Sequence, residues 1–201
     1  MKNNIEVEIR GPISKDEYDI LNQFLLKEGI FKEKRERVFI DYSPEIENRT
    51  KDIRIRETNG IPEIILKLGS WGGSESREEI SVKTESGKFE ALVKTFGELG
   101  FEKGILCVRN SVAYDYKGIE FALVEVPNHS YYFEAEILTV PEKSVEAEAE
   151  IKKVCEGLRL KVFSREDFFK YVETLNKEAN KTFEYKDFQK GYFDEKRYLI
   201  S

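Results

Sequence analysis

Polar and apolar residues alternate along several short stretches of the chain, which is the pattern of β-strands with one apolar and one charged face. Residues 5–10 place isoleucine and valine on one side and charged residues on the other. Residues 52–57 alternate in the same way and are followed by Asn59-Gly60, a dipeptide that favours a tight hairpin turn. The pattern predicts strands over residues 5–10, 38–42, 52–57, 63–68, 75–82, 105–114, 119–126 and 131–140.

Other stretches carry apolar residues every three or four positions, which is the spacing of an amphipathic helix. One begins after Ser14, which together with Glu17 forms the pattern of a capping box, and it is expected to end near Gly29. Ser164 is the expected N-cap of the last helix. The predicted helices cover residues 14–29, 89–99, 146–158 and about 164–175, and the aromatic remainder 182–201 is expected to wrap as a tail.

The order of these elements indicates a fold class. Most of the predicted strands follow one another directly, with helices inserted early, midway and at the end of the chain. Consecutive antiparallel strands in this number favour a barrel or a strongly curved sheet. No internal repeat or linker divides the chain. The sequence therefore predicts an α+β protein built on such a barrel or sheet.

The proportion of charged residues is high. Of the 201 residues, 36% are charged, against roughly 25% in an ordinary soluble domain. Disorder is one explanation, but a hydrophobic content of 40% predicts a packed core. The 33 basic and 39 acidic residues give a net charge of −6, so we expect no broad basic surface for nucleic acid.

A single histidine and two cysteines limit the chemistry that the chain can carry. A Ser-His-Asp triad would have to use His129, which we interpret as an exposed loop residue, and a zinc site of Cys and His ligands has too few groups. Cys107 and Cys155 form no disulfide framework and are expected in the core. No apolar signal segment or membrane-spanning stretch is present, so we expect a cytoplasmic protein without a membrane partner.

Charged side chains on the predicted strands are segregated by sign. Glu6 and Glu8 share one face of the first strand, and Glu134 and Glu136 share one face of the last, each pair opposite apolar residues. One interpretation is the solvated face of an open sheet, but the segregation favours a site. The charged positions on the same faces of these and other strands are Arg10, Arg54, Arg56, Lys67, Arg77, Glu79 and Arg109.

These two kinds of charge suit a metal–triphosphate complex. Hard divalent cations such as Mg²⁺ prefer oxygen ligands and often share them with substrate phosphates. Arginine forks and lysine ammonium groups bind the oxygens of a polyphosphate. Like charges inside a barrel would repel strongly unless a metal and an anion balanced them. The sequence therefore predicts a metal–triphosphate site inside a barrel.

The order of these motifs resembles the CYTH superfamily, also called triphosphate tunnel metalloenzymes, which includes class IV adenylate cyclases, thiamine triphosphatases and inorganic triphosphatases. The N-terminal Glu-x-Glu-x-Lys strand of that family is similar to Glu6-Val-Glu8-Ile-Arg10, and its closing Glu-x-Glu is similar to Glu134-Ala-Glu136. The resemblance extends over roughly residues 3–176. The motifs between the two ends are similar to Arg54-Ile-Arg56, Lys67, Arg77-Glu-Glu79 and Arg109.

The resemblance implies an eight-stranded antiparallel β-barrel with flanking helices, whose charged tunnel binds a triphosphate with Mg²⁺ or Mn²⁺. It implies a single CYTH-like domain over residues 1–201, with the barrel and helices over about 3–176 and a C-terminal extension over about 177–201. The implied catalytic residues are Glu6, Glu8 and Arg10. The implied metal ligands are Glu6, Glu8, Glu79, Glu125, Glu134 and Glu136, and the implied substrate-binding residues are Arg54, Arg56, Lys67, Arg77 and Arg109.

The chain departs from the family pattern at three positions. Arg10 stands where the family usually has lysine, which keeps the charge but not the compact ammonium geometry. Ser111 stands where a second arginine is common on the sixth strand. On the seventh strand, where an acidic residue is expected, strict spacing points to Val124, whereas Glu125 fits only if the following turn is one residue shorter.

Two further segments have alternative interpretations. The mixed-charge run 32–37 is interpreted as a solvated strand end rather than a nucleic-acid patch. The glycine-rich segment 69–74 is interpreted as a flexible connection, and the alternative is that Trp71 caps a tunnel mouth over a base or thiazole.

The leading functional hypothesis is a metal-dependent phosphohydrolase that acts on tripolyphosphate, thiamine triphosphate or a nucleoside triphosphate. The alternatives are a class IV-type adenylate cyclase, which converts ATP to cyclic AMP and pyrophosphate, and a non-catalytic polyphosphate- or nucleotide-binding module. The expected partner is a small molecule that contains a triphosphate, and the expected state is a monomer or homodimer.

Overall fold

The structure is a computed structural model that describes residues 4–43, 46 and 49–193. None of the helices in this part of the chain is long and apolar enough to span a membrane. The helices are α1 (Lys15–Glu28), α2 (Phe89–Glu98), α3 (Ser144–Gly157) and α4 (Arg165–Glu178). The strands are β1 (Ile5–Ile13), β2 (Ile30–Asp41), β3 (Lys51–Thr58), β4 (Ile61–Leu68), β5 (Ser74–Lys83), β6 (Lys103–Tyr116), β7 (Ile119–Val126), β8 (Ser130–Thr139) and β9 (Lys181–Glu184).

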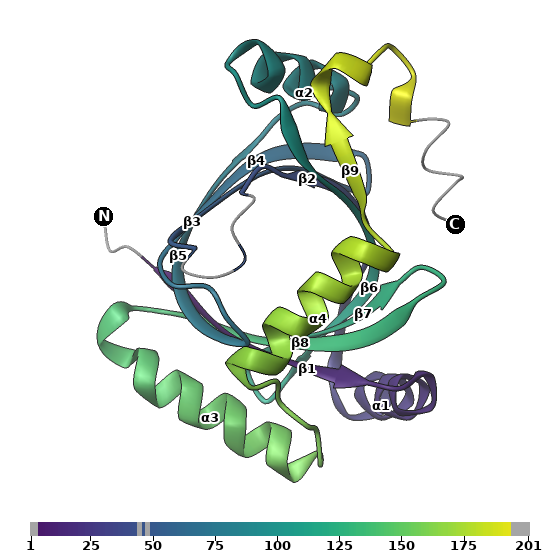
Figure 1. Cartoon of the computed structure of the whole chain (residues 1–201). Helices are drawn as coiled ribbons and strands as arrows, with labels where there is room; N and C mark the ends of the chain where they lie inside the picture. Colours follow the sequence, from purple (N-terminus) through teal and green to yellow (C-terminus); the bar gives the residue numbers. More distant parts are fainter. Residues whose placement is uncertain (1–3, 44–45, 47–48, 194–201) are drawn as a thin grey trace.

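Eight of these strands close into an antiparallel barrel (Figure 1). They follow one another around the ring in the order β2, β3, β4, β5, β1, β8, β7, β6, and the pairing of β6 with β2 closes it. The short strand β9 pairs with the first residues of β6 and extends the sheet beside the ring. The predicted α+β fold with an eight-stranded antiparallel barrel is therefore confirmed.

Helices cover the outside of the barrel and one of its mouths. α3 packs on β1 and β8, α2 packs on β3 and β4, and α4 crosses the mouth that faces the viewer in Figure 1. The apolar side chains of the strands point outward into two cores, one around Phe121 and Phe133 and the other around Phe96 and Phe183, while a smaller cluster of Trp71, Phe163 and Phe168 lies at α4. Because the hydrophobic cores lie outside the barrel wall, the interior is left to the polar faces of the strands.

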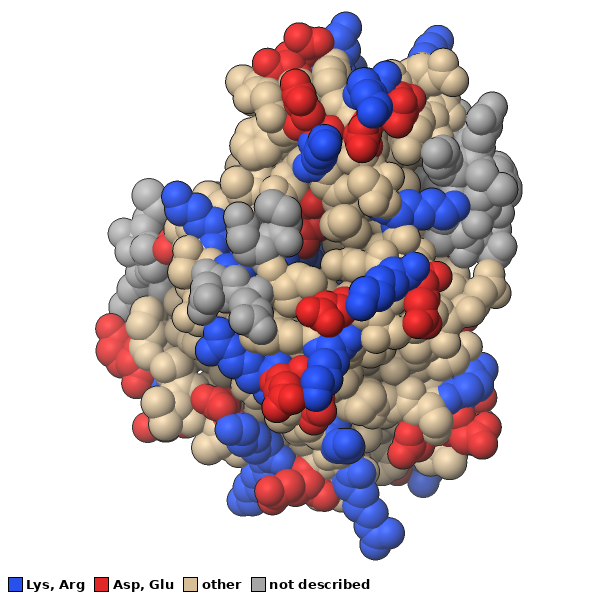
Figure 2. Space-filling model, viewed as in Figure 1, with Lys and Arg blue, Asp and Glu red and all other residues tan. Residues whose placement is uncertain are grey.

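The capping box predicted at the start of α1 is present. The Ser14 hydroxyl accepts a hydrogen bond from the backbone N–H of Glu17 at 3.2 Å, and the Ser14 N–H donates to the Glu17 carboxylate at 2.7 Å. On the face of the molecule shown in Figure 2, basic and acidic side chains of the described residues are interspersed rather than gathered by sign.

The first strand is longer than predicted, because it continues through Gly11 and Pro12 to Ile13. Gly11 lies opposite Phe133 in the ladder with β8. A Cβ atom at Gly11 would lie 1.9 Å from the backbone oxygen of Lys161 and 2.5 Å from the Phe133 ring. The glycine therefore does not end the strand; it lets the segment before α4 pass close to it.

We expect Gly11→Ala to destabilise the protein by about 3 kcal/mol, because the backbone at Lys161 would have to move. Chemical denaturation would measure the change. Gly157→Ala is the matched control, since a Cβ there meets nothing within 4 Å at the end of α3. That variant should stabilise the protein by about 0.5 kcal/mol. Equal effects of the two substitutions would contradict the assignment of Gly11 to a close approach.

The second strand also differs from the prediction. β2 begins at Ile30 rather than at residue 38, and its ladder with β6 extends back to Ile30 opposite Asp115. The segment 32–37 is a strand end with Lys32, Glu33, Lys34 and Glu36 exposed, as interpreted from sequence, and its ladder with β6 also makes it part of the barrel wall. Low local hydrophobicity hid this strand, because its inward face borders a polar tunnel instead of an apolar core.

Candidate active site

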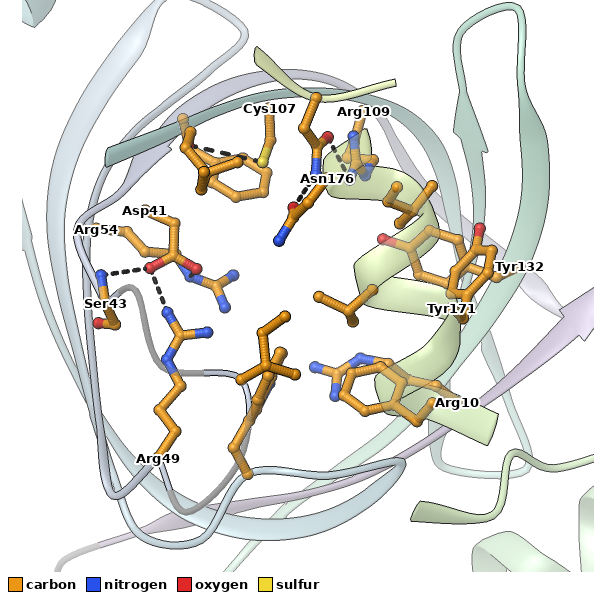
Figure 3. Close-up of a pocket in the computed structure, with 18 of the residues that line it drawn as sticks. Arg10, Asp41, Ser43, Arg49, Arg54, Cys107, Arg109, Tyr132, Tyr171 and Asn176 are labelled. Atoms are coloured by element: carbon orange, nitrogen blue, oxygen red, sulfur yellow. Dashed lines mark hydrogen bonds and ion pairs between the residues drawn. The ribbon is translucent and has the colours of Figure 1, made fainter. Parts of the chain in front are cut away.

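Two adjoining cavities occupy the barrel interior. One has a volume of about 300 Å³ and is lined mostly by charged side chains; we call it the charged chamber. The other, of about 190 Å³, lies under α4 and is lined by aromatic and apolar side chains together with four arginines, two carboxylates and two asparagines; we call it the aromatic chamber (Figure 3). The residues that line both chambers are Arg10, Phe39, Arg54, Arg109, Tyr132 and Glu134.

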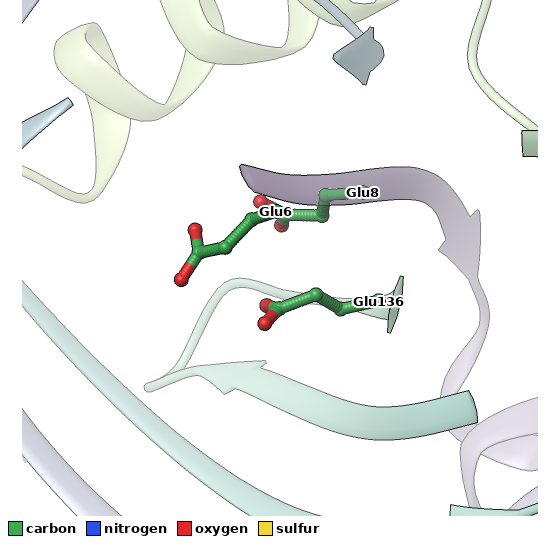
Figure 4. Close-up of side chains that lie close together, drawn as sticks. All are labelled: Glu6, Glu8 and Glu136. Atoms are coloured by element: carbon green, nitrogen blue, oxygen red, sulfur yellow. The ribbon is translucent and has the colours of Figure 1, made fainter. Parts of the chain in front are cut away.

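Three carboxylates, Glu6, Glu8 and Glu136, gather on one wall of the charged chamber, and we call them the carboxylate cluster (Figure 4). One oxygen from each lies within 4.8 Å of the others. Glu8 and Glu136 are direct partners across β1 and β8, and Glu6 lies two residues before Glu8 on the same face of β1. Strand alternation together with this register therefore assembles the cluster.

Burial and mutual repulsion disfavour the ionised form of this cluster. Burial raises the pKa of Glu8 well above its usual value in spite of the neighbouring Arg10 guanidinium. Burial and then the Glu6 carboxylate raise the pKa of Glu136 to about 7. When ionised, the cluster thus carries more negative charge than its neighbours neutralise, which is the electrostatic condition for binding a cation.

Lys67 flanks the cluster from β4. Its ammonium group lies 2.5 Å from a Glu6 oxygen and 3.0 Å from a Glu79 oxygen. Although burial opposes it, the charges of Glu8 and Glu6 raise the pKa of Lys67. The predicted ligand Glu79 is thus placed at the edge of the cluster, as a partner of Lys67.

Arg10 lies between the two chambers and contacts three carboxylates. Its guanidinium lies 2.6 Å from Glu8, 2.8 Å from Glu75 and 3.2 Å from Glu134. Burial opposes ionisation of Glu134, but the Arg10 charge lowers the pKa of that carboxyl to about 2. Glu134, which the sequence grouped with Glu136, is therefore ionised and engaged with Arg10, and it lies outside the carboxylate cluster.

Arginines from β2, β3 and β6 form the facing part of the charged chamber, and we call them the arginine wall. In the ring of eight strands, β2 is four strands away from β1, so this wall lies across the tunnel from the carboxylate cluster. Arg56 is held at 2.8 Å by Glu63, and Arg54 at 2.7 Å by Asp52. The members of the wall are Arg35, Arg37, Arg54, Arg56 and Arg109.

Two members of the wall, Arg37 and Arg109, face each other across the β2–β6 ladder. Within the described part of the chain, neither forms an ion pair with a carboxylate, and the buried Nε of Arg37 has no hydrogen-bond partner. Burial and then the charges of Arg56 and Arg35 lower the pKa of Arg37 to about 10. Positive charge is therefore uncompensated at this point, as expected of a site for an anion.

The strand β2 supplies an arginine next to Ser111, where the family pattern has an arginine on the sixth strand itself. Arg35 is the register partner of Ser111, so β2 places a guanidinium beside the position where the family commonly has arginine on the sixth strand. Sequence reasoning missed both Arg35 and Arg37. The signal was present, because they continue the alternation of Phe39 and Asp41 on the inner face of β2.

Two predicted site residues do not line either chamber. Arg77 points inward but is only 2% exposed, and it pairs with Glu75 at 2.7 Å and with Asp52 at 3.2 Å. Arg77 is therefore a buried ion-pair partner of the two carboxylates that also pair with Arg10 and Arg54.

Glu125 lies on the outer face of β7, where it accepts a hydrogen bond from the Tyr131 hydroxyl at 3.3 Å. This corrects its assignment to the tunnel: Ala122 and Val124 face inward, and Glu125 lies one residue out of phase with them. The acidic residue that β7 places in the charged chamber is Glu120, opposite Glu136 and 2.7 Å from Arg35.

A divalent cation fits the carboxylate cluster by the chemistry of its donors. All three side chains offer oxygen atoms, which Mg²⁺ and Mn²⁺ prefer, and these atoms lie close enough to serve one ion. Burial is the main cause of the raised pKa values of Glu8 and Glu136, and a bound cation would offset the cost of their ionised forms.

The segment 69–74 connects β4 to β5, and its Trp71 packs against the tunnel end. Trp71 is 7% exposed, lines the aromatic chamber and contacts the rings of Phe168 and Phe169. Cys107 is buried as expected, but it faces the same chamber. His129 is exposed in the β7–β8 turn, as expected, and contacts Glu178.

The sequence matches no family model and no curated protein. Among solved structures, the PH1819 protein from Pyrococcus horikoshii is 23% identical, with a TM-score of 0.65 over 86% of this chain and 98% of that one. A candidate adenylate cyclase from Vibrio parahaemolyticus is 14% identical, with a TM-score of 0.58 over 80% and 94% of the two chains. A candidate adenylyl cyclase from Hippeastrum, described as having a dominant triphosphatase activity, is 13% identical, with a TM-score of 0.51 over 84% and 96%.

At these identities the likeness establishes the fold. The chain folds as these structures do, and the barrel fold that was expected from its motifs is therefore confirmed.

Proposed function

We propose that the chain is a metal-dependent phosphohydrolase that binds the triphosphate of its substrate in the charged chamber. The observation that carries this proposal is the juxtaposition of a carboxylate cluster with two arginines, Arg37 and Arg109, that have no carboxylate partner among the described residues. The first group suits a divalent cation and the second suits an anion, and a triphosphate complexed with a metal ion supplies both.

Glu6, Glu8 and Glu136 would hold the cation, and Mg²⁺ or Mn²⁺ bound there would supply polarisation of phosphate oxygens and activation of water. Arg37 and Arg109 donate hydrogen bonds to the phosphate oxygens, and Arg54 and Arg56 add charge along the chain of phosphates. These guanidinium groups stabilise the negative charge that develops on the departing diphosphate as the terminal phosphoryl group is transferred to water. Carboxylate oxygens that the cation leaves free accept hydrogen bonds from the attacking water and orient it.

Arg10 has a supporting role in this proposal. Its contacts with Glu8 and Glu134 fix the position of the cluster relative to the aromatic chamber. As a guanidinium with three carboxylate neighbours, it balances buried negative charge and leaves phosphate binding to the arginine wall.

The test is a substrate screen with the purified protein. We expect phosphate release from at least one of tripolyphosphate, thiamine triphosphate and ATP in Mg²⁺ or Mn²⁺, and loss of that activity in EDTA. Colorimetric detection of phosphate with chromatography of the products measures it. Release that is unaffected by chelation would contradict metal dependence, and tight binding without turnover in either metal would indicate a binding module.

An adenylate cyclase is the second candidate. It is favoured by the aromatic chamber, which adjoins the arginine wall through Arg54 and Arg109 and offers space for a base. The products decide between the two reactions, because a cyclase yields cyclic AMP and pyrophosphate from ATP, whereas the proposed hydrolase yields ADP and phosphate.

A further inference from the structure

The aromatic chamber has the size and lining of a site for one ring system. Its volume is about 190 Å³, and an apolar cavity of about 150 Å³ is already large enough to hold benzene. Trp71, Phe168 and Tyr171 contribute ring surface from the loop before β5 and from α4. Planar aromatic walls of this kind favour an aromatic ligand through stacked and edge-to-face contacts.

The charges around this chamber disfavour a positively charged ring. The guanidinium groups of Arg49, Arg10 and Arg54 already lie over aromatic rings, at 4.6 Å from Trp71, 5.4 Å from Phe168 and 5.2 Å from Phe39. The carboxylates that line the chamber, Asp41 and Glu134, are each paired with an arginine. A neutral ring would add no repulsion, whereas a cationic ring such as a thiazolium would meet guanidinium charge.

A chain of hydrogen bonds fixes the polar group that points into the chamber. Arg109 can only donate, and its Nη2 donates to Asn180 Oδ1 at 3.0 Å. Asn180 must then use its amide nitrogen, which donates to Asn176 Oδ1 at 2.8 Å. Asn176 is left with its own Nδ2 directed into the chamber, as Figure 3 shows, and no described residue accepts from it.

We propose that the aromatic chamber binds a neutral nitrogen heterocycle of the nucleobase class and that Asn176 is its specificity-determining residue, donating to a ring nitrogen or carbonyl. This inference rests on the proposed function, because the ring would be carried by the triphosphate in the adjoining charged chamber. The chain Arg109–Asn180–Asn176 then links the group that reads the ring to a guanidinium of the arginine wall.

Binding is the direct test, and Trp71 is a natural reporter because it is the only tryptophan of the chain. Non-hydrolysable analogues of the four common nucleoside triphosphates, thiamine triphosphate and inorganic tripolyphosphate would be titrated with Mg²⁺ by calorimetry and by tryptophan fluorescence. We expect at least one nucleotide to bind about tenfold more tightly than tripolyphosphate and to change the Trp71 emission, whereas tripolyphosphate leaves it unchanged.

Two variants test Asn176. Asn176→Leu removes the donor without adding charge, and Asn176→Asp keeps the acceptor for Asn180. In both variants, the ratio of nucleotide affinity to tripolyphosphate affinity should fall about 3- to 10-fold. A change in phosphate binding alone would alter both affinities equally and leave this ratio unchanged. If one variant misfolds, the other still tests the role of Asn176. The fluorescence titration of the wild-type protein tests the binding of the ring independently of both variants.

The outcomes separate this inference from the proposed function. Three results would overturn the inference while leaving metal-dependent hydrolysis intact. They are equal affinities for nucleotides and tripolyphosphate, tighter binding of thiamine triphosphate than of any nucleotide, and an unchanged ratio of nucleotide affinity to tripolyphosphate affinity in both variants. Selective nucleotide binding without any hydrolysis in Mg²⁺ or Mn²⁺ would support the inference and overturn the proposed hydrolase.

Discussion

Replacement of Glu136 by glutamine is expected to reduce metal-dependent phosphate release about 100-fold or more. Loss of residues that only support a metal ligand typically costs 10- to 100-fold, and Glu136 would itself be a ligand. Steady-state kinetics over a range of Mg²⁺ concentrations would measure the loss, which should include a higher metal requirement. Unchanged kcat and metal dependence would contradict the assignment of the carboxylate cluster.

A stability measurement separates that loss from misfolding. Because burial and Glu6 raise the pKa of Glu136 to about 7, its ionised form destabilises the metal-free fold as the pH rises from its unfolded value through 7. Glu136→Gln removes this repulsion, so at pH 8 the metal-free variant should be at least as stable as the wild type. Glu125→Gln is the matched variant on the outer face of β7, and it should keep its activity.

Replacement of Arg37 by methionine is expected to weaken substrate binding about 10- to 100-fold without loss of stability. A charge-assisted hydrogen bond to phosphate contributes about 1.5–3 kcal/mol, and methionine keeps the apolar stem of the side chain. In the absence of substrate, Arg37 is repelled by Arg56 and Arg35 and has no carboxylate partner within the described residues. Calorimetric titration with tripolyphosphate and thermal unfolding of the same sample would measure both effects.

Arg77→Met is the contrasting variant. Arg77 is almost fully buried and pairs with Asp52 and Glu75, so its loss leaves two buried carboxylates with fewer partners. We expect a loss of about 3 kcal/mol of stability. If instead Arg37→Met unfolded the protein and Arg77→Met did not, the division between a binding arginine and a structural one would be wrong.

The charged residues show what the alternation along a single strand predicts and what it does not. Alternation alone predicted that Glu6 and Glu8 share a face of one strand and that Glu134 and Glu136 share a face of another, and the structure has both. Alternation did not predict that Glu134 would be engaged by Arg10 while Glu136 joined the cluster. That difference depends on which residues the neighbouring strand places beside each carboxylate.

The same limit explains the residues that were missed or misplaced. Arg35 and Arg37 lie in the first part of β2, where the apolar content is too low for a strand to be recognised locally, and the ladder with β6 extends the strand through them. Glu125 was assigned by counting through a turn of uncertain length, and an error of one residue moves a side chain to the other face of the sheet. Glu120 was the inward residue that this counting overlooked.

The sequence by itself determined most of the strands, the helices and the sign of the charge on most inward faces, because a strand's period of two and a helix's period of 3.6 are local properties. Its motifs also indicated the barrel and a metal–triphosphate site through their resemblance to a known superfamily. Only the tertiary structure decided which charges meet. Closure of the ring placed the carboxylate cluster across from Arg37 and Arg109, and the position of α4 directed Asn176 into the aromatic chamber. These contacts depend on register and on strand and turn lengths, which no single segment of the chain specifies.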